Sequence, residues 1–188
     1  KLNDFCKDLK NGNSKCNLLH SILEKESKIK VKFFKSQCVD TIHYIVFIQC
    51  MIDNILIRLG KENHSFPRGF PILWQPNKLI HMFGFLPKFE NDTRQKEYIP
   101  DKSITSVKFF KKYSGFLGQL VMYKINNNYY WSCFSKNSAS SESMFIQDSN
   151  RLFAPYVTKD IVEYFVDNNL HICAEIMSKN DQTHGAKV

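Results

Sequence analysis

The sequence contains no Cys-x-x-Cys pair, no secretory signal and no apolar run long enough to cross a bilayer. Its six cysteines are widely scattered, which is typical of reduced cytosolic thiols and argues against a disulfide framework or a zinc site. The longest apolar run, residues 42–52, is about half the roughly 20 residues that a membrane helix needs. We therefore expect a soluble, non-secreted protein of the cytoplasm or nucleus, with no membrane partner.

Internal repeats, a low-complexity tail and a clear domain linker are also absent from the sequence. Its 188 residues are 43% hydrophobic and 14% aromatic, a composition that argues for a folded chain and against intrinsic disorder. The net charge of +8 favours polyanionic partners, because clustered cations attract phosphates and release counterions. No protein partner is predicted.

Residue patterns along the chain predict an α+β fold with mostly antiparallel strands. One helix is expected within residues 1–27 and another after Thr158, a good N-cap residue. Residues 52–59 are compatible with either a strand or a helix. Loops are expected at residues 90–102 and 137–150. The expected strands are residues 29–34, 43–50, 70–74, 78–83, 104–110, 116–125, 129–135 and 170–177.

Lys112 is the first candidate for chemistry, since it opens a K-x-x-G turn that follows an apolar and basic segment. Lys112 alone would be read as a solvated lysine. Other cations precede and follow it at even steps of 20, 24 and 24 residues, and a carboxylate follows 39 residues after the last cation. These companions are Arg68, Lys88, Lys136 and Glu175. Four cations and one carboxylate beside β-rich segments describe a pocket for a triphosphate and a ribose.

A lysine that attacks phosphorus must be neutral, yet with a pKa near 10.4 only about one free lysine in 10³ is neutral at pH 7. Neighbouring cations lower such a pKa and also grip phosphates. Gly115 would let the turn approach a nucleotide without a Cβ in the way. Glu175 lies in an apolar segment, where a carboxylate is costly unless it has a partner.

Taken in order, these segments resemble the ATP-dependent RNA ligases of the phage RNA ligase 1 and fungal or baculoviral tRNA-ligase type, which are covalent nucleotidyltransferases. That family carries an Arg-Gly segment, a PKF(F)N segment, the K-x-x-G nucleophile, an SK-x-S segment and a glutamate on a strand. The matching segments here are residues 66–69, 87–91, 112–115, 135–138 and 172–176. The resemblance covers roughly residues 60–188, and only the ordered set of five is specific.

The resemblance implies a two-metal-assisted ligation in three steps, with ATP and Mg²⁺ (or Mn²⁺) as cofactors. Lys112 would form a lysyl-AMP, AMP would pass to an RNA 5′-phosphate, and a 3′-hydroxyl would displace it. Arg68 and Lys88 would contact the triphosphate, Lys136 would add a further nucleotide contact together with Gly115, and Glu175 would touch ribose or metal. The implied function is the joining of RNA ends in RNA or tRNA repair.

Two departures from the family pattern stand out. Ser114 replaces the Asp or Asn of many relatives, at a position that varies between branches. The family also has a later carboxylate-glycine segment that binds metal and a later pair of lysines, and neither is found in the 13 residues after Glu175. We therefore expect a nucleotidyltransferase (ligase adenylation) domain that is incomplete at its C-terminus. Such a domain would be inactive alone if the missing motifs are essential for catalysis. Residues 1–60 would be its N-terminal part, and residues 61–188 its nucleotide-binding core.

Other functions remain open on the sequence alone. An mRNA-capping guanylyltransferase or a DNA ligase would use the same lysine chemistry, although the Arg-Gly and PKF segments favour the RNA ligase branch. A non-catalytic, basic RNA-binding remnant is the alternative outside enzymes, and the missing motifs are its best support. Tyr129, Tyr130 and Trp131 are interpreted as core and hairpin packing rather than as a surface for base stacking.

Overall fold

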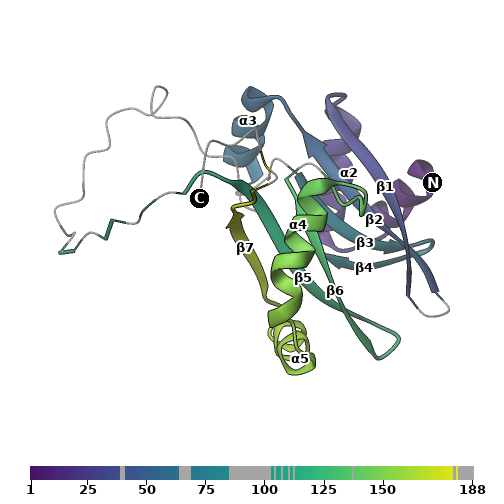
Figure 1. Cartoon of the computed structure of the whole chain (residues 1–188). Coiled ribbons are helices and arrows are strands. Elements are labelled where there is room, and N and C mark those ends of the chain that lie inside the picture. The colour runs from purple at the N-terminus through teal and green to yellow at the C-terminus, as the bar shows by residue number, and fades with distance from the viewer. Residues whose placement is uncertain are drawn as a thin grey trace.

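The described residues form two antiparallel sheets with flanking helices, an arrangement of the α+β class (Figure 1). The computed structural model describes residues 1–38, 41–63, 69–84, 113–136, 138–179 and 181, with the single positions 103, 105, 106, 108, 109 and 111. No helix in these parts of the chain is both long and apolar enough to cross a membrane. The expected division at residue 60 stays a prediction and falls within a helix.

Sheet 1 has the strand order β1-β2-β3-β4. Its strands are β1 (Ile29–Cys38), β2 (Thr41–Cys50), β3 (Gly69–Gln75) and β4 (Lys78–Met82). The expected hairpin around residues 75–77 is confirmed, because Gln75 pairs with Lys78. Asn77 has a φ of 70°, a left-handed conformation that asparagine tolerates better than most residues.

Sheet 2 has the strand order β6-β5-β7, so that the strand after Lys112 is central. Its strands are β5 (Phe116–Ile125), β6 (Asn128–Ser135) and β7 (His171–Ile176), all close to the expected ranges. Asn126 and Asn127 connect β5 to β6 with φ values of 48° and 65°. Two positive φ values in a two-residue loop match the turn that best fits the twist of a hairpin.

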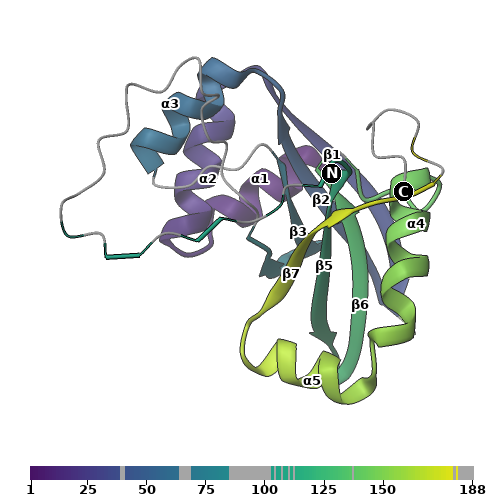
Figure 2. The same cartoon turned by 60° about the vertical axis from the view of Figure 1, so that its left-hand side comes forward.

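Helices cover the outer face of each sheet, which gives four layers (Figures 1 and 2). On sheet 1 lie α1 (Leu2–Lys10), α2 (Ser14–Lys25) and α3 (Asp53–Asn63). On sheet 2 lie α4 (Met144–Phe153) and α5 (Lys159–Asp167), with a 3-10 turn, Ala154–Tyr156, between them. The predicted cap of α5 is confirmed, since the Ile161 N–H donates to Thr158 Oγ1 at 3.4 Å.

Strand alternation explains the layers, because successive side chains point to opposite faces. Val46 and Ile48 of β2 pack under the helices of sheet 1, whereas Ile45 and Phe47 face sheet 2. In the same way Leu120 and Met122 of β5 face α4 and α5, whereas Val121, Tyr123 and Ile125 face sheet 1. The core between the sheets is therefore built from alternate residues of both.

Three sequence predictions of local structure were wrong. The N-terminal region contains two helices, not one, because Asn13 starts a new helix by accepting the Cys16 N–H at 3.1 Å. The loop expected at residues 137–150 includes most of α4, whose apolar Ile146 packs against sheet 2. The expected strand at residues 104–110 is not found at its described positions, which are 105, 106, 108 and 109.

Candidate functional site

The register of sheet 2 brings two of the candidate residues to the same end of the sheet. Leu117 of β5 pairs with Glu175 of β7, and Gly118 pairs with Ser135 of β6, the residue before Lys136. Lys136 and Glu175 therefore lie on either side of Leu117, at the end where β5 begins. By strand alternation both residues share the face of Leu117, which looks toward sheet 1.

Gly115 joins this end of the sheet through its backbone. Its N–H donates to Glu175 Oε1 at 2.9 Å. A Cβ on Gly115 would lie 2.3 Å from the Ile176 carbonyl oxygen, closer than any real side chain comes to backbone. The φ of Gly115 is not positive, so a glycine is not required here by the backbone conformation. It is required because β7 lies so close. The space that a side chain would take is filled by β7. The expected approach of this turn to a nucleotide stays a prediction.

Gly69, the residue after Arg68, ties sheet 1 to the same place. A Cβ on Gly69 would lie 2.8 Å from the Lys136 carbonyl oxygen and 2.8 Å from Cε1 of Phe47. The start of β3 therefore packs directly against the end of β6. Four of the motifs therefore have a described residue at the same end of the paired sheets. They are the Arg-Gly, K-x-x-G, SK-x-S and glutamate motifs, with Gly69, Gly115, Lys136 and Glu175.

The segment that leaves β4 also reaches this region, and a residue missed by sequence reasoning holds it. Gln119 is fully buried, and its Nε2 donates to the Gly84 carbonyl oxygen, three residues before Pro87. Its Oε1 is buried and has no hydrogen-bond partner among the described residues. Gln119 shares the inter-sheet face with Leu117. A polar residue within the apolar run of β5 was the signal that could have identified it.

The predicted site residues divide into two groups. Gly115, Lys136 and Glu175 are described and lie together as above, whereas Lys112, Arg68 and Lys88 lie outside the described residues. Glu175 is exposed, so the expected cost of burying its carboxylate does not arise. The residues beside Lys112 are exposed as well, and Lys111 Nζ lies 4.9 Å from the centre of the Tyr113 ring.

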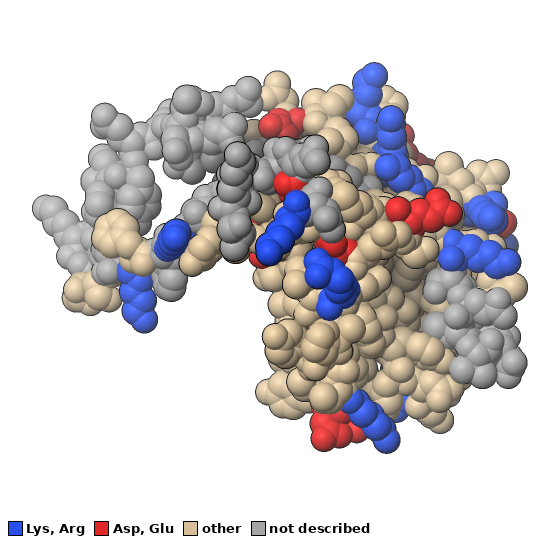
Figure 3. Space-filling view, viewed as in Figure 1, with Lys and Arg blue, Asp and Glu red and all other residues tan. Residues whose placement is uncertain are grey.

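Charge is unevenly distributed over the face drawn in Figure 3. Basic and acidic side chains both lie near the end of sheet 2 where β5 begins, the middle of this face is uncharged, and further basic and acidic side chains lie at its lower end, near α5 (Figure 3). Among the described residues, no three of the His, Cys, Asp and Glu side chains gather closely enough to hold a metal ion by themselves. Glu175 is the carboxylate that the converging segments bring to this end.

Two histidines face one cavity farther along the inter-sheet layer. His81 of β4 and His171 of β7 line a cavity of about 160 Å³ together with Tyr123 and Phe165. Burial lowers the pKa of both imidazoles, and the neighbouring His171 lowers that of His81 further. Both rings are therefore neutral near pH 7, which suits a packing role between the sheets.

Comparison with known proteins gives no relative for this arrangement. No family model, curated protein or solved structure matches this chain.

Proposed function

We propose that this chain is the adenylation unit of an ATP-dependent RNA ligase, which joins RNA 5′-phosphate and 3′-hydroxyl ends. The observation that carries the proposal is the hydrogen bond between the Gly115 N–H and Glu175 Oε1 at 2.9 Å. It links the glycine of the K-x-x-G motif to the glutamate 60 residues later in the chain. The close approach of Gly69 to the Lys136 carbonyl brings the Arg-Gly and SK-x-S segments to the same end of the sheets.

Chain connectivity supports Lys112 as the nucleophile. Lys112 precedes Gly115 by three residues in the K-x-x-G motif. Arg68 is bonded directly to Gly69, whose backbone packs on the Lys136 carbonyl. Arg68 and Lys136 are thus candidates to bind the β- and γ-phosphates of ATP. Lys88 is a third candidate, and it follows Gly84, whose carbonyl oxygen accepts a hydrogen bond from Gln119. Their positive charges would also favour the neutral form of Lys112.

In the proposed reaction, the neutral Lys112 Nζ attacks the α-phosphorus of ATP. An N–P bond forms, the P–O bond to pyrophosphate breaks, and the lysine loses a proton to solvent. An oxygen of the RNA 5′-phosphate then attacks the same phosphorus and releases the lysine. Finally the RNA 3′-hydroxyl attacks the activated 5′-phosphate, and AMP leaves. Positioning and electrostatic stabilisation carry most of such catalysis.

The residues present fit a divalent ion that binds together with ATP. One oxygen of Glu175 accepts the Gly115 N–H, and the exposed carboxylate has a second oxygen to offer. Mg²⁺ is commonly held by one or two carboxylates plus substrate phosphates, so three protein ligands are not required. When bound, Mg²⁺ or Mn²⁺ would neutralise phosphate charge and favour the departure of pyrophosphate.

The proposal is tested by incubating the chain with Mg²⁺ and ATP labelled at the α-phosphate, followed by a denaturing gel. We expect an acid-labile label on the protein that falls at least about 100-fold in Lys112→Ala. Lys111→Ala is the matched control and should keep the label, because only Lys112 has the K-x-x-G spacing. Equal labelling from GTP would favour capping instead. An unlabelled wild-type chain that still binds RNA, and that stays unlabelled when the chain is extended at its C-terminus, would favour the non-catalytic alternative.

A further inference from the structure

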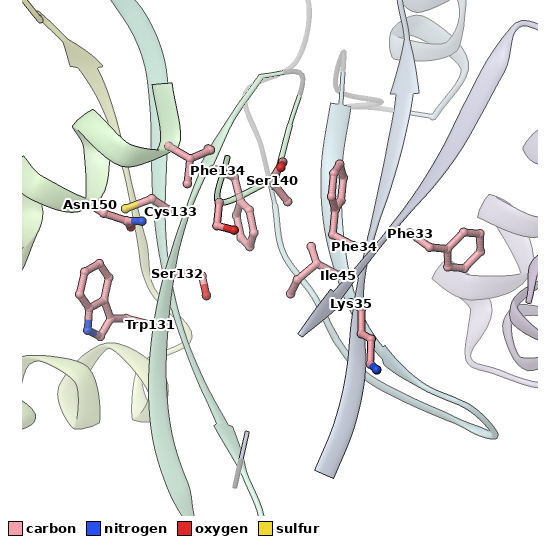
Figure 4. Close-up of a pocket in the computed structure, with 13 residues that line it drawn as sticks. Phe33, Phe34, Lys35, Ile45, Trp131, Ser132, Cys133, Phe134, Ser140 and Asn150 are labelled. Carbon is pink, nitrogen blue, oxygen red and sulfur yellow. The ribbon is translucent and has the colours of Figure 1, made fainter. Parts of the chain in front are cut away.

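Two lysines of β1, Lys30 and Lys32, stand on the face of sheet 1 that looks toward sheet 2. Lys32 pairs with Phe47, which belongs to the core between the sheets, and directly paired residues share a face. Figure 4 looks into a cavity of about 630 Å³ between β1 and β6 and shows the same alternation farther along. There Phe33 points away from β6, whereas Ile45 of the paired strand points toward it (Figure 4). Lys30 lies two residues before Lys32, so both lysines share the inter-sheet face.

Both lysines are exposed, although they lie on this face. Phe34, the next residue on the same side, packs against the core between the sheets, so the covered part of the face ends between Lys32 and Phe34. Neither lysine forms an ion pair with any described residue. Glu26, the nearest carboxylate in the sequence, is already paired with Arg58. Two uncompensated positive charges therefore face solvent at the edge of the inter-sheet layer.

The register of sheet 1 places these lysines beside the candidate site. Lys30, Gln49 and Gly69 form one row across three neighbouring strands. Adjacent strands are about 4.8 Å apart, so the Lys30 Cα lies about 10 Å from the Gly69 Cα. Gly69 in turn packs against the Lys136 carbonyl oxygen. Lys30 and Lys32 therefore extend the cations of the candidate site to the outer edge of sheet 1.

We propose that Lys30 and Lys32 bind phosphates of a single-stranded RNA segment that leads to the candidate site. Alternate residues of a strand are about 6.7 Å apart on one face, so each ammonium group can contact a different phosphate of an extended RNA strand. This inference rests on the proposed function, since it takes RNA as the substrate. Inward-pointing charges on an edge strand also hinder its pairing with other chains, and the experiment separates the two roles.

The experiment measures the fluorescence anisotropy of a short fluorescein-labelled oligouridylate with the full chain, without ATP, over a series of salt concentrations. Each phosphate contact on a single strand contributes about 0.7 to the slope of log affinity against log salt. The double variant Lys30→Gln, Lys32→Gln should therefore reduce that slope by about 1.4. If the affinities converge at about 1 M salt, binding at about 0.1 M weakens about 25-fold. Lys30→Arg, Lys32→Arg keeps both charges and should bind within about twofold of wild type.

The double variant Lys124→Gln, Lys159→Gln is the matched control, because it removes the same charge from exposed lysines near the end of β5 and at the start of α5. Its salt slope should stay close to that of wild type. An equal loss of slope in both double variants would reduce the effect to net charge and overturn the proposal. Equal displacement of the RNA by poly-aspartate would also overturn it. So would a Lys30→Gln, Lys32→Gln chain that self-associates yet binds RNA normally, since the lysines would then protect the edge strand.

Binding without ATP keeps this test separate from the proposed chemistry. A chain that is never labelled by ATP, even when extended at its C-terminus, but that needs both lysines for RNA would keep the RNA surface and lose the ligase reaction. A labelled chain whose RNA binding ignores both lysines would keep the reaction and overturn the surface. A wild-type chain that does not bind the oligouridylate at about 0.1 M salt would overturn the surface as well.

Discussion

Replacement of Gly115 by alanine tests whether β5 and β7 meet as closely as the structure has them. The new Cβ would lie 2.3 Å from the Ile176 carbonyl oxygen, a backbone atom that cannot rotate away. Relieving such a clash costs about 1–3 kcal/mol. Separation of the strands would also break the hydrogen bond from the Gly115 N–H to Glu175, which contributes about 0.5–1.5 kcal/mol.

One effect opposes this loss, since Gly→Ala reduces the entropy of the unfolded chain and stabilises by about 0.4–1 kcal/mol. The clash and the lost bond outweigh it, so we expect Gly115→Ala to lower the free energy of unfolding by about 1–3 kcal/mol. For a chain of this length the melting temperature should fall by about 3–10 °C. Urea unfolding followed by tryptophan fluorescence measures the change.

Gly118→Ala is the matched control on the same strand. Its Cβ would meet Ile176 Cγ1 at 2.7 Å and Ser149 Oγ at 3.2 Å, which are side-chain atoms. Since side chains can change rotamer, Gly118→Ala should destabilise less than Gly115→Ala. Equal stability of Gly115→Ala and wild type, or a larger loss in Gly118→Ala, would refute the close approach of Gly115 to β7.

Two further predictions concern stability. Asp8→Ala should lower the free energy of unfolding by about 1–3 kcal/mol in urea titrations, because Asp8 Oδ2 accepts from the Trp74 indole at 2.8 Å and from the Asn77 N–H at 2.9 Å. Asp8→Asn keeps an acceptor and should lose less; an equal loss would contradict the hydrogen-bond argument. The second prediction is that the chain loses stability as the pH falls below about 6.5, since burial holds the pKa values of His81 and His171 below their unfolded value and the unfolded state binds protons first. Urea midpoints measured between pH 7.5 and pH 5 should fall less in the double variant His81→Gln, His171→Gln, and an unchanged slope would exclude these two residues as the cause.

One hairpin in each sheet could be predicted from sequence, because turn residues at 75–77 and 126–128 separate runs with clear strand character. Helix α4 could not, since its first turn follows a Ser-rich segment and only its packed residues, such as Ile146, reveal a helix. The adjacency of Gly115, Lys136 and Glu175 depends on register, which sequence alone does not specify for strands far apart in the chain. Gln119 is visible in the sequence as a polar residue within an apolar strand, but its hydrogen bond to Gly84 depends on contacts that the sequence alone does not give.

The pairing of β5 with β7 has a consequence for how the chain folds. The hairpins of sheet 1 and the β5–β6 hairpin join neighbouring segments, whereas β7 reaches β5 only after the intervening β6, α4 and α5 have been accommodated. Long-range pairings form slowly, because the entropy of closing the loop is lost before the contacts are gained. We therefore expect the β5–β7 ladder to form late. The contact between Gly115 and Glu175 would then be among the last to appear on refolding, after most of the hydrophobic core is in place.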